Sequence, residues 1–311
     1  MTFMFRPASR EGVGLLIGLI GPSGSGKTYS AMRLAKGIAG DKPFAVIDTE
    51  AGRAKHYSDA FRFDHGDMKP PFHPAAYADA IHAADAAGYP AIVVDSMSHE
   101  HAGEGGLLDM HEAELERMAG DNWQKREAVK VAAWIKPKMA HKAMVQKLLQ
   151  IRAHLILCFR AEEKIKMERV DGKMKIIPLG WVPICEKSLP YELTASLLLT
   201  PDAPGAPKPI KLQEQHRALF PLDRPIGETA GHHIAEWASG APSVATIEAE
   251  KKTIAATVAR MVKAFAVLGV GEDVLAEHVG RKDLADLDDE EVVKLREFYA
   301  AKKAAAEGEE I

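Results

Sequence analysis

Residues 21–28 read GPSGSGKT and match the phosphate-binding loop pattern, G-x-x-x-x-G-K-[ST]. The glycines of this pattern let backbone N–H groups surround phosphate oxygens, the lysine reaches the β- and γ-phosphates, and the last hydroxyl binds Mg²⁺. An apolar run at 15–20 precedes the loop and a helix-compatible stretch at 29–38 follows it. Because such a loop works between a buried strand and a helix, it restricts the fold to the α/β class. It also predicts that a nucleoside triphosphate is bound by Gly21, Pro22, Ser23, Gly24, Ser25, Gly26, Lys27, Thr28 and Tyr29, with Thr28 as a Mg²⁺ ligand.

Apolar runs and helix-compatible stretches alternate along residues 1–240. This alternation is typical of a mostly parallel sheet with flanking crossover helices. Residues 99–152, between the third and fourth strands, are expected to form a helical insertion in that core. The predicted strands are 15–20, 44–48, 91–95 and 155–159, and the other predicted helices are 77–87, 107–118, 123–135, one that begins at Pro137, and 232–238.

After the fourth strand the pattern is less regular. Residues 162–177 are expected to form a basic hairpin that turns at Asp171-Gly172, because Asp-Gly favours a two-residue turn. Residues 191–200 and 209–212 are expected to add antiparallel edge strands. Residues 201–209 contain four prolines and one glycine, and a loop is expected there.

The pattern changes again beyond a linker predicted at 239–243, where the sequence reads SGAPS. From there it is purely helical, and the predicted helices are 244–268, 272–279 and 288–303. The last of these begins with four acidic residues and ends with two lysines, which the helix dipole favours. We therefore expect a core at 1–240 and a small helical module at 244–306.

Composition points to the cytoplasm. The chain has 311 residues, a formal net charge of −4 and 47% hydrophobic residues. Neither a membrane span nor a secretion signal is recognisable. Cys158 and Cys185 are the only cysteines, and Cys158 lies in an apolar run, which favours a buried free thiol over a disulfide.

Two acidic segments end predicted strands. Asp95 ends the run AIVVD, 68 residues beyond Lys27, where the Walker B pattern places a carboxylate that holds a Mg²⁺-bound water. Asp48 and Glu50 follow the second strand, and the carboxyl ends of such strands surround the ligand. Hydrolysis needs a general base beside the attacking water, and Glu50 is predicted to be that base. The alternative is a surface acid that pairs with Arg53.

The loop, followed by AVIDTE and AIVVDS, resembles the RecA-like P-loop ATPase core in order and spacing. Further segments resemble the P-loop ATPases encoded by bacteriophages and prophages: VIDTEAGRAKHY, VVDSMSHEHAGEGGLLDMH, LILCFRAEEK and LPYELTASLLLTP. Some members of that family are regarded as single-strand-annealing or recombination ATPases. The resemblance covers about residues 13–240. It implies ATP and Mg²⁺ as ligands, ATP hydrolysis, assembly into a homo-oligomer, and, for a phage-encoded protein, the host cytoplasm.

Carried across residue by residue, the resemblance assigns Lys27 and Thr28 to phosphate and Mg²⁺, Glu50 to the base, and Asp95 to the Mg²⁺-bound water. Arg160 falls where RecA-like proteins carry a polar γ-phosphate sensor, usually an amide. An arginine departs from that pattern, and it either contacts phosphate or pairs with an acid. RecA-like enzymes often complete the site with a basic residue of the neighbouring subunit, for which the candidates are Lys164, Lys166 and Lys208.

Two histidines follow the Walker B strand closely. Metal ligation by His99 and His101 is not expected, because no second cluster of His or Cys lies at ligand spacing. A polar contact near the γ-phosphate is expected for His99, and a solvated loop position for His101.

Charge is unevenly distributed along the chain. Residues 95–121 contain eight acids and one arginine, whereas residues 130–187 contain thirteen Lys/Arg and five Asp/Glu. Such a basic block is either a polyanion footprint or a set of solvated faces. In RecA-like proteins the loops after Walker B and after the next strand face DNA, and here they correspond to the insertion and the hairpin. The predicted contacts to single-stranded DNA are Lys138, Lys142, Lys164, Lys166, Lys173 and Lys175, with Trp123, Trp134 and Trp181 as possible stacking surfaces.

Two other functions remain open. One is a P-loop phosphotransferase, although such enzymes usually need an Arg-rich lid and Glu50 suits water activation better. The other is a nucleotide-switched interaction protein that does not bind DNA. ATP is favoured over GTP by the resemblance and by the lack of an N-K-x-D motif. The acidic stretch at 283–291 favours a protein partner for the helical module, such as a single-strand-binding or annealing protein.

Overall fold

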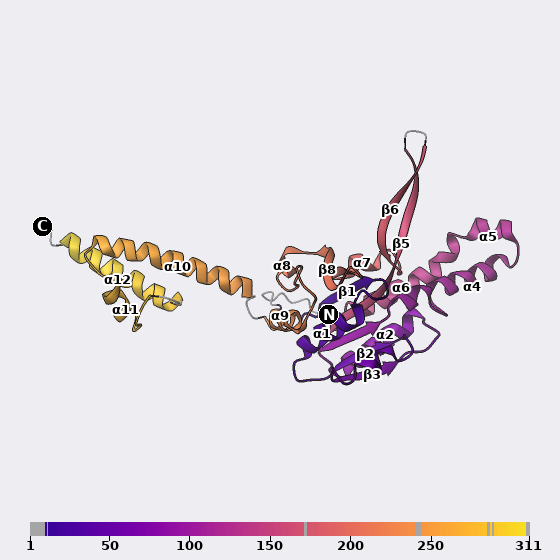
Figure 1. Cartoon of the computed structure of the whole chain (residues 1–311), viewed down its shortest axis with the longest axis horizontal. Helices are drawn as coiled ribbons and strands as arrows, with labels where there is room; N and C mark the ends of the chain where they lie inside the picture. The colour runs from indigo at the N-terminus through magenta and orange to yellow at the C-terminus, as the bar shows by residue number, and fades with distance from the viewer. Residues whose placement is uncertain are drawn as a thin grey trace, which may run out of the picture. The chain divides into compact units, whose positions relative to one another are not determined.

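This computed structural model describes residues 10, 12–170, 173–240, 244–284, 287 and 289–308. Contacts divide the chain into two compact units, Met1–Ala241 and Pro242–Ile311. The first unit is a mostly parallel sheet with flanking helices and the second is helical (Figure 1), so the α/β prediction is confirmed. The predicted turn at Asp171-Gly172, the last three residues of the predicted linker and Asp288 lie outside the described residues.

The sheet has eight strands in the order β3-β2-β4-β5-β1-β7-β8, and β6 pairs only with β5. Neighbouring strands from β3 to β7 run parallel, whereas β7–β8 and β5–β6 are antiparallel. All four strands predicted for the core are present. The strands are β1 (Leu16–Gly21), β2 (Phe44–Asp48), β3 (Phe63–Asp67), β4 (Ala91–Asp95), β5 (His154–Val170), β6 (Lys173–Pro183), β7 (Ala195–Thr200) and β8 (Ala203–Leu212).

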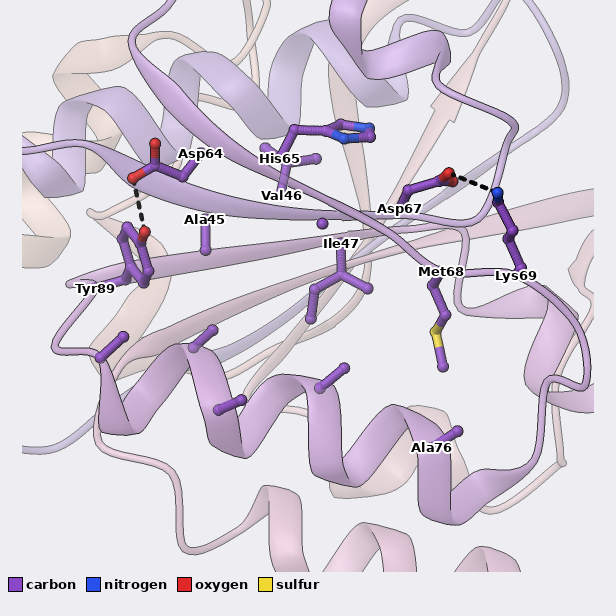
Figure 2. A pocket seen from close by; sticks show the side chains of 15 residues that line it. Ala45, Val46, Ile47, Asp64, His65, Asp67, Met68, Lys69, Ala76 and Tyr89 are labelled. Atoms are coloured by element: carbon purple, nitrogen blue, oxygen red, sulfur yellow. Dashed lines mark hydrogen bonds and ion pairs between the residues drawn. The ribbon is translucent and has the colours of Figure 1, made fainter.

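The sequence does not predict edge strand β3, which reads FDHGD and therefore lacks an apolar run. It pairs with β2 alone, so its outer side faces solvent and tolerates polar residues. Figure 2 shows the alanine-rich side of α2 opposite β2 and β3. A groove of about 560 Å³ lies between them, and at one end the Tyr89 hydroxyl donates to Asp64 at 2.6 Å.

Two expectations for residues 191–212 are wrong. Residues 195–200 form an inner strand, parallel to β1, rather than an antiparallel edge. The proline-rich stretch predicted as a loop belongs to edge strand β8. Pro207 and Pro209 pair with β7 where the register shifts, and edge strands and bulges are the places where proline, which lacks an N–H, is tolerated.

The helices of the insertion also differ in their bounds. The helix expected at 123–135 is split, because a short 3-10 turn, Ala132–Trp134, separates α5 from α6. Helix α6 begins at Ile135, and Pro137 occupies its first turn, where no N–H is needed. The helices of the first unit are α1 (Lys27–Ala39), α2 (Pro74–Ala86), α3 (Ser98–Ala102), α4 (Leu107–Ala119), α5 (Trp123–Val129), α6 (Ile135–Leu148), α7 (Leu189–Glu192), α8 (Glu214–Arg217) and α9 (Glu228–Ala238).

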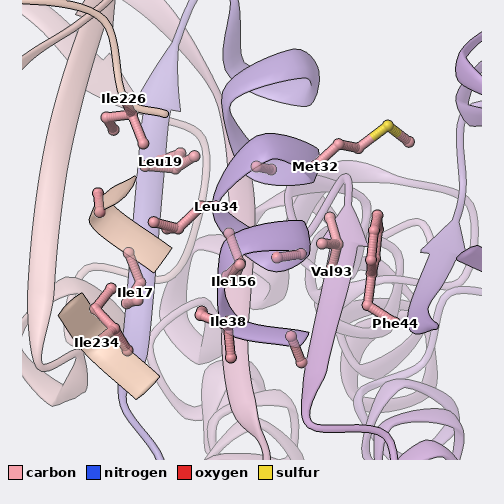
Figure 3. Close-up of a cluster of buried hydrophobic side chains, with 14 of the residues drawn as sticks. Ile17, Leu19, Met32, Leu34, Ile38, Phe44, Val93, Ile156, Ile226 and Ile234 are labelled. Carbon is pink, nitrogen blue, oxygen red and sulfur yellow. The ribbon is translucent and has the colours of Figure 1, made fainter. Parts of the chain in front are cut away.

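Helices cover both faces of the sheet and give two apolar cores. On one face α1 and α9 pack against the strands, with Leu34 and Ile234 among the buried side chains (Figure 3). On the other face α2 and α6 supply Tyr77 and Leu148. Because the central strands are buried on both faces, they read as continuous apolar runs, which is why the sequence predicts them well.

The second unit consists of α10 (Val244–Val267), α11 (Glu272–His278) and α12 (Asp289–Gly308) around a core of its own that includes Phe265, Leu275 and Leu295. In the described part of the chain, no single helix is long and apolar enough to cross a membrane. Only the bent pair Lys252–Val267 and Glu272–His278 passes that test, taken together and by length and composition alone.

Candidate functional site

The phosphate loop joins β1, which ends at Gly21, to α1, which begins at Lys27. Gly24 and Gly26 have φ values of 77° and 80°, a left-handed conformation that residues with side chains rarely adopt. The Lys27 amino group donates to the Pro22 carbonyl at 2.8 Å. This hydrogen bond closes the loop on itself beside the N-terminal end of α1. The N-terminal end of a helix attracts anions. Burial lowers the pKa of Lys27 from its usual value.

Strand β8 holds the loop from one side. Gly205 donates its N–H to the Ser25 carbonyl at 2.9 Å and accepts a hydrogen bond from the N–H of Ile226 at 2.9 Å. A Cβ on Gly26 would lie 3.0 Å from the Gly205 nitrogen, so the backbones approach closely because this loop position is glycine. Gly205 thus contacts the phosphate loop, although it belongs to the stretch 201–209, for which the sequence predicts a loop. The sequence does not indicate this contact.

Thr28 and Asp95, the two predicted Mg²⁺ residues, lie together. The Thr28 hydroxyl donates to Asp95 Oδ2 at 2.5 Å. Asp95 is buried, and desolvation raises the pKa of its carboxyl above the usual value. A hydroxyl and a carboxylate beside a phosphate loop suit Mg²⁺, which takes oxygen ligands and keeps several waters and phosphate oxygens in its shell. Thr28 would bind the ion directly, and Asp95 would hold one of its waters.

Asp48 shapes the turn after β2 and is almost fully buried. Its carboxylate accepts hydrogen bonds from the N–H groups of Glu50 at 2.6 Å and Ala54 at 2.9 Å, and Nε2 of His65 lies 3.1 Å away. These bonds fix the backbone that carries Glu50. Asp48 is therefore a positioning residue for the predicted base.

Glu50 is bound by two arginines. Its Oε1 accepts from Arg160 Nε at 2.8 Å and Nη2 at 2.5 Å, and its Oε2 lies 3.4 Å from Arg53 Nη1. Only 11% of the Glu50 side chain is exposed, against 75% for Arg53. The tighter pair is with Arg160, whose N–H is in turn fixed by the Ser98 hydroxyl at 2.9 Å. Of the two alternatives for Arg160, the structure contains the ion pair with an acid.

Most of the phosphate loop, with Thr28, Glu50, Asp95 and Arg160, lines one pocket of about 560 Å³, and Asp48 and Gly205 support it from outside the lining. Sequence reasoning missed four of its residues: Arg53 as a pocket residue, Tyr57, Ala161 and Ile184. Tyr29 and Tyr57 both line the pocket, with ring centres 5.9 Å apart, and such an aromatic surface can pack against a nucleobase. Tyr57 comes from the 3-10 turn Arg53–Tyr57, and no motif in the sequence marks it.

A family model described as an AAA domain matches residues 14–188, more than half of the chain. The chain belongs to this family of AAA-type P-loop ATPases. No curated protein matches it. The matched span of this AAA-type ATPase contains the phosphate loop, Glu50, Asp95 and Arg160, and ends before β7. The assignment supports nucleotide binding and hydrolysis in general, while the roles of the individual residues stay predictions.

His99 and His101 belong to α3, and neither is among the residues that line this pocket. His99 Nδ1 is 2.7 Å from the Thr49 hydroxyl, and its ring stacks on Phe72 at 5.0 Å. Burial, with a smaller effect of Arg160, lowers the pKa of His99. His101 lies in helix α3 and is partly buried, so the expected solvated loop position is wrong, and burial lowers its pKa as well.

The predicted DNA contacts are spread over two elements. Lys138 and Lys142 lie on α6, and Lys138 Nζ is 4.0 Å from Glu186. The other four belong to the β5–β6 hairpin, which projects from the core (Figure 1). Of these, Lys164 and Lys166 are paired with Glu162 and Glu168 at 2.9 and 3.2 Å, while Lys173 and Lys175 lie on β6.

Alternation along the hairpin separates two faces. Lys166 pairs across the ribbon with Ile177, and Glu168 with Lys175, so that face is largely charged. The other face holds exposed apolar side chains: Ile165, Met167, Met174 and Ile176. The sequence predicts the basic character of the hairpin but not its apolar face, which follows from the register.

The remaining candidates are separate from the pocket. Trp123 is exposed on α5, Trp134 stacks on His111 with ring centres 4.3 Å apart, and Trp181 is partly buried on β6. Lys208, a candidate for completing a neighbouring site, lies 3.3 Å from Asp202. Cys158 is a buried free thiol, as expected, and Cys185 is free and buried as well.

Proposed function

We propose that this protein hydrolyses ATP with Mg²⁺ as cofactor and that Glu50 activates the attacking water. The observation that carries the proposal is the convergence of Lys27, the Thr28–Asp95 pair and Glu50 on one pocket. Strands β2 and β4 are adjacent and parallel, with Asp48 opposite Asp95. A carboxylate base and a metal-binding carboxylate thus come from the same sheet edge, where ligands of open α/β sheets bind.

In the proposed reaction Lys27 exchanges the Pro22 carbonyl for β- and γ-phosphate oxygens. Bound Mg²⁺ would neutralise charge on those oxygens. Glu50 accepts a proton from water as the water oxygen attacks the γ-phosphorus, and ADP and phosphate are the products. A base that takes its proton from water favours hydrolysis over phosphotransfer.

Arg160 links the base to the nucleotide. In the structure it occupies Glu50 Oε1, so that oxygen is not free to accept a proton. We propose that a bound γ-phosphate competes for the guanidinium, because a phosphate carries more charge than a carboxylate. Oε1 of Glu50 then becomes available when a triphosphate is bound.

The proposal is tested by measuring phosphate release and ATP binding for Lys27→Ala, Glu50→Gln and the control Glu192→Gln, an exposed carboxylate on α7. Lys27→Ala should lose tight binding. Glu50→Gln should keep binding and lose about 10²–10⁴-fold in rate, the usual share of a general base. The control should behave as the unaltered protein does. A wild-type rate in Glu50→Gln would show that another residue is the base.

We further propose that the ATPase acts on single-stranded DNA, as a RecA-like homo-oligomer of phage origin with a role in recombination, annealing or replication. Support comes from the resemblance of its segments to phage P-loop ATPases, and from the lysines of a hairpin that begins next to Arg160. Ala161 and Ile184, at the base of this hairpin, line the nucleotide pocket, so DNA bound to the hairpin could influence the site through two residues.

Steady-state phosphate release with and without oligo-dT, combined with sedimentation in a non-hydrolysable ATP analogue, tests this second proposal. Stimulation by oligo-dT and nucleotide-dependent assembly are expected. An active monomer that ignores oligo-dT would instead support the nucleotide-switched interaction protein.

A further inference from the structure

The helical second unit has a groove between α10 and α12. The volume of this groove is about 380 Å³, and it is lined by Thr257, Arg260, Met261, Ala264, Arg296 and Tyr299. Its floor is the partly buried set Met261, Ala264 and Tyr299, and the two exposed arginines come one from each helix. We call this feature the two-arginine groove.

The positive charge of the two-arginine groove is not neutralised locally by ion pairs in the described part of the second unit. Among the described residues, neither Arg260 nor Arg296 forms an ion pair. Arg260 donates only to the Ala256 carbonyl and the Thr257 hydroxyl, at 3.3 and 3.4 Å. By contrast, Arg281 of the same unit makes a paired contact with Glu291 at 2.6 and 3.0 Å. Two like charges on opposite walls of one groove repel each other and are stabilised by a bound anion.

We propose that the two-arginine groove binds an acidic segment of a partner protein, with an aliphatic or aromatic side chain of that segment on the Met261–Tyr299 floor. Carboxylates match the planar fork of a guanidinium, which can donate two parallel hydrogen bonds. The apolar floor between the two arginines favours binding of a peptide, which can bury a side chain there, over binding of a free anion. This inference does not depend on the proposed ATP hydrolysis.

The surroundings of the groove favour a peptide over nucleic acid. Residues 244–308 contain thirteen acidic and ten basic residues, so the module as a whole repels a polyanion. A short peptide that places one or two carboxylates at the arginines avoids this repulsion. Nucleic-acid surfaces instead spread positive charge along the whole path of the backbone.

The test uses the full chain and a set of synthetic peptides in which aspartates flank a single Leu, Phe or Trp, each with a matched version carrying Asn for Asp. Fluorescence anisotropy should show micromolar binding for Asp peptides and binding about tenfold weaker for the Asn versions, a difference of about 1.4 kcal/mol. The combined change Arg260→Glu and Arg296→Glu should abolish the preference for Asp. Lys263→Glu with Lys294→Glu, on the same helices but outside the groove, is the matched control and should change affinity less than about twofold.

Arg260→Gln with Arg296→Gln removes the charge while keeping long side chains. If circular dichroism shows that the Glu variant is unfolded, this Gln variant tests the preference for Asp in its place. Failure of every Asp peptide to bind, or equal loss in the lysine control, would overturn the proposal. So would oligo-dT that outcompetes the peptides and loses affinity only in the arginine variants, which would make the groove a nucleic-acid site. A dimer that dissociates in those variants would assign it to a second copy of the chain.

Discussion

The two halves of strand β5 share one continuous backbone and have opposite surroundings. The inner half, residues 154–159, lies between β4 and β1, where Leu155, Leu157 and Phe159 are at most 1% exposed. The outer half, residues 161–170, pairs with β6 alone, and Ile165 and Met167 are 60% and 67% exposed. Arg160 stands at the junction and binds Glu50.

Because of this contrast, we assign folding stability to the inner half of β5 and binding of a partner to its outer half. Apolar side chains of the inner half contribute to the free energy of folding because they leave water, whereas those of the outer half remain in it. An exposed two-stranded ribbon is marginal on its own, and contiguous exposed apolar side chains usually mark an interaction site. We therefore expect changes in the inner half to affect folding and changes in the outer half to affect binding.

The largest expected effect is on stability. Leu157→Ala should lower the free energy of unfolding by about 2–5 kcal/mol, because it leaves a cavity in the fully buried core between β1 and β4. Ile165→Ala is the matched change in the outer half and should stay within about 0.5 kcal/mol. Urea unfolding followed by circular dichroism measures both. Similar losses at the two positions would remove the contrast, because the hairpin would then belong to the cooperative core.

The contrast also explains what the sequence predicts and what it leaves out. Strands β2 and β4 have the predicted bounds, because burial on both faces leaves an uninterrupted apolar signal. Edge strands β3 and β8 carry polar residues or prolines, and their pairing comes from the neighbouring strand rather than from their own pattern. The predicted strand at 155–159 stops where the apolar run stops, although β5 continues to Val170.

For the site, the loop motif and two strand ends predict Lys27, Thr28, Asp95 and Glu50 as neighbours, because parallel strands end at one sheet edge. The Glu50–Arg160 pair spans 110 positions of sequence and depends on the register of β5 against β1. The hydrogen bond between Gly205 and Ser25 similarly depends on where β8 lies. Neither interaction leaves a local pattern, so both emerge only from the fold.

The next effect concerns pH and the first residue of β5. Burial lowers the pKa of His154 to about 4, and its Nδ1 accepts a hydrogen bond from the Leu15 N–H at 3.2 Å. The unfolded chain, with a histidine pKa of about 6.5, binds the proton more readily than the folded chain. Neutral His154 therefore contributes to the free energy of unfolding in full above about pH 6.5. This contribution, about 3 kcal/mol in total, is lost as the pH falls toward 4.

The stability of the protein against urea, measured from pH 7 down to pH 4, should therefore fall more steeply than that of His154→Asn. In this variant the amide oxygen can take the place of Nδ1 as acceptor, and the side chain does not titrate. The difference between the two profiles isolates His154 from the other histidines. Parallel profiles would mean that burial in β5 does not lower the pKa of His154.

At the junction, Arg160→Ala should leave folding nearly unchanged and weaken ATP binding, because the γ-phosphate loses a partner. It should also lower the rate of hydrolysis by about 10²-fold, the usual cost of removing one group that stabilises developing charge. Arg160→Lys keeps the charge but cannot make the two-nitrogen contact with Glu50, so it should recover only part of the rate. Single-turnover kinetics measures both variants, with Arg62→Ala as an exposed control. A faster rate in Arg160→Ala would show that the arginine only restrains Glu50.

The smallest expected effect lies in the outer half. Replacing Lys164, Lys166, Lys173 and Lys175 with Glu should weaken oligo-dT binding several-fold. The slope of log affinity against log salt should become shallower by about 0.7 for each phosphate that the variant no longer neutralises. Because the outer half of β5, which carries Lys164 and Lys166, pairs with β6 alone, the melting temperature and ATP affinity should remain as in the unaltered protein.

The matched control for this hairpin variant changes net charge by the same amount at exposed positions outside the hairpin, through Lys42→Glu, Lys69→Glu, Lys125→Glu and Lys252→Glu. If this control weakens oligo-dT binding equally, net charge rather than the hairpin determines affinity. If neither variant weakens binding, the DNA path lies elsewhere, and Lys138 and Lys142 on α6 become the next positions to change.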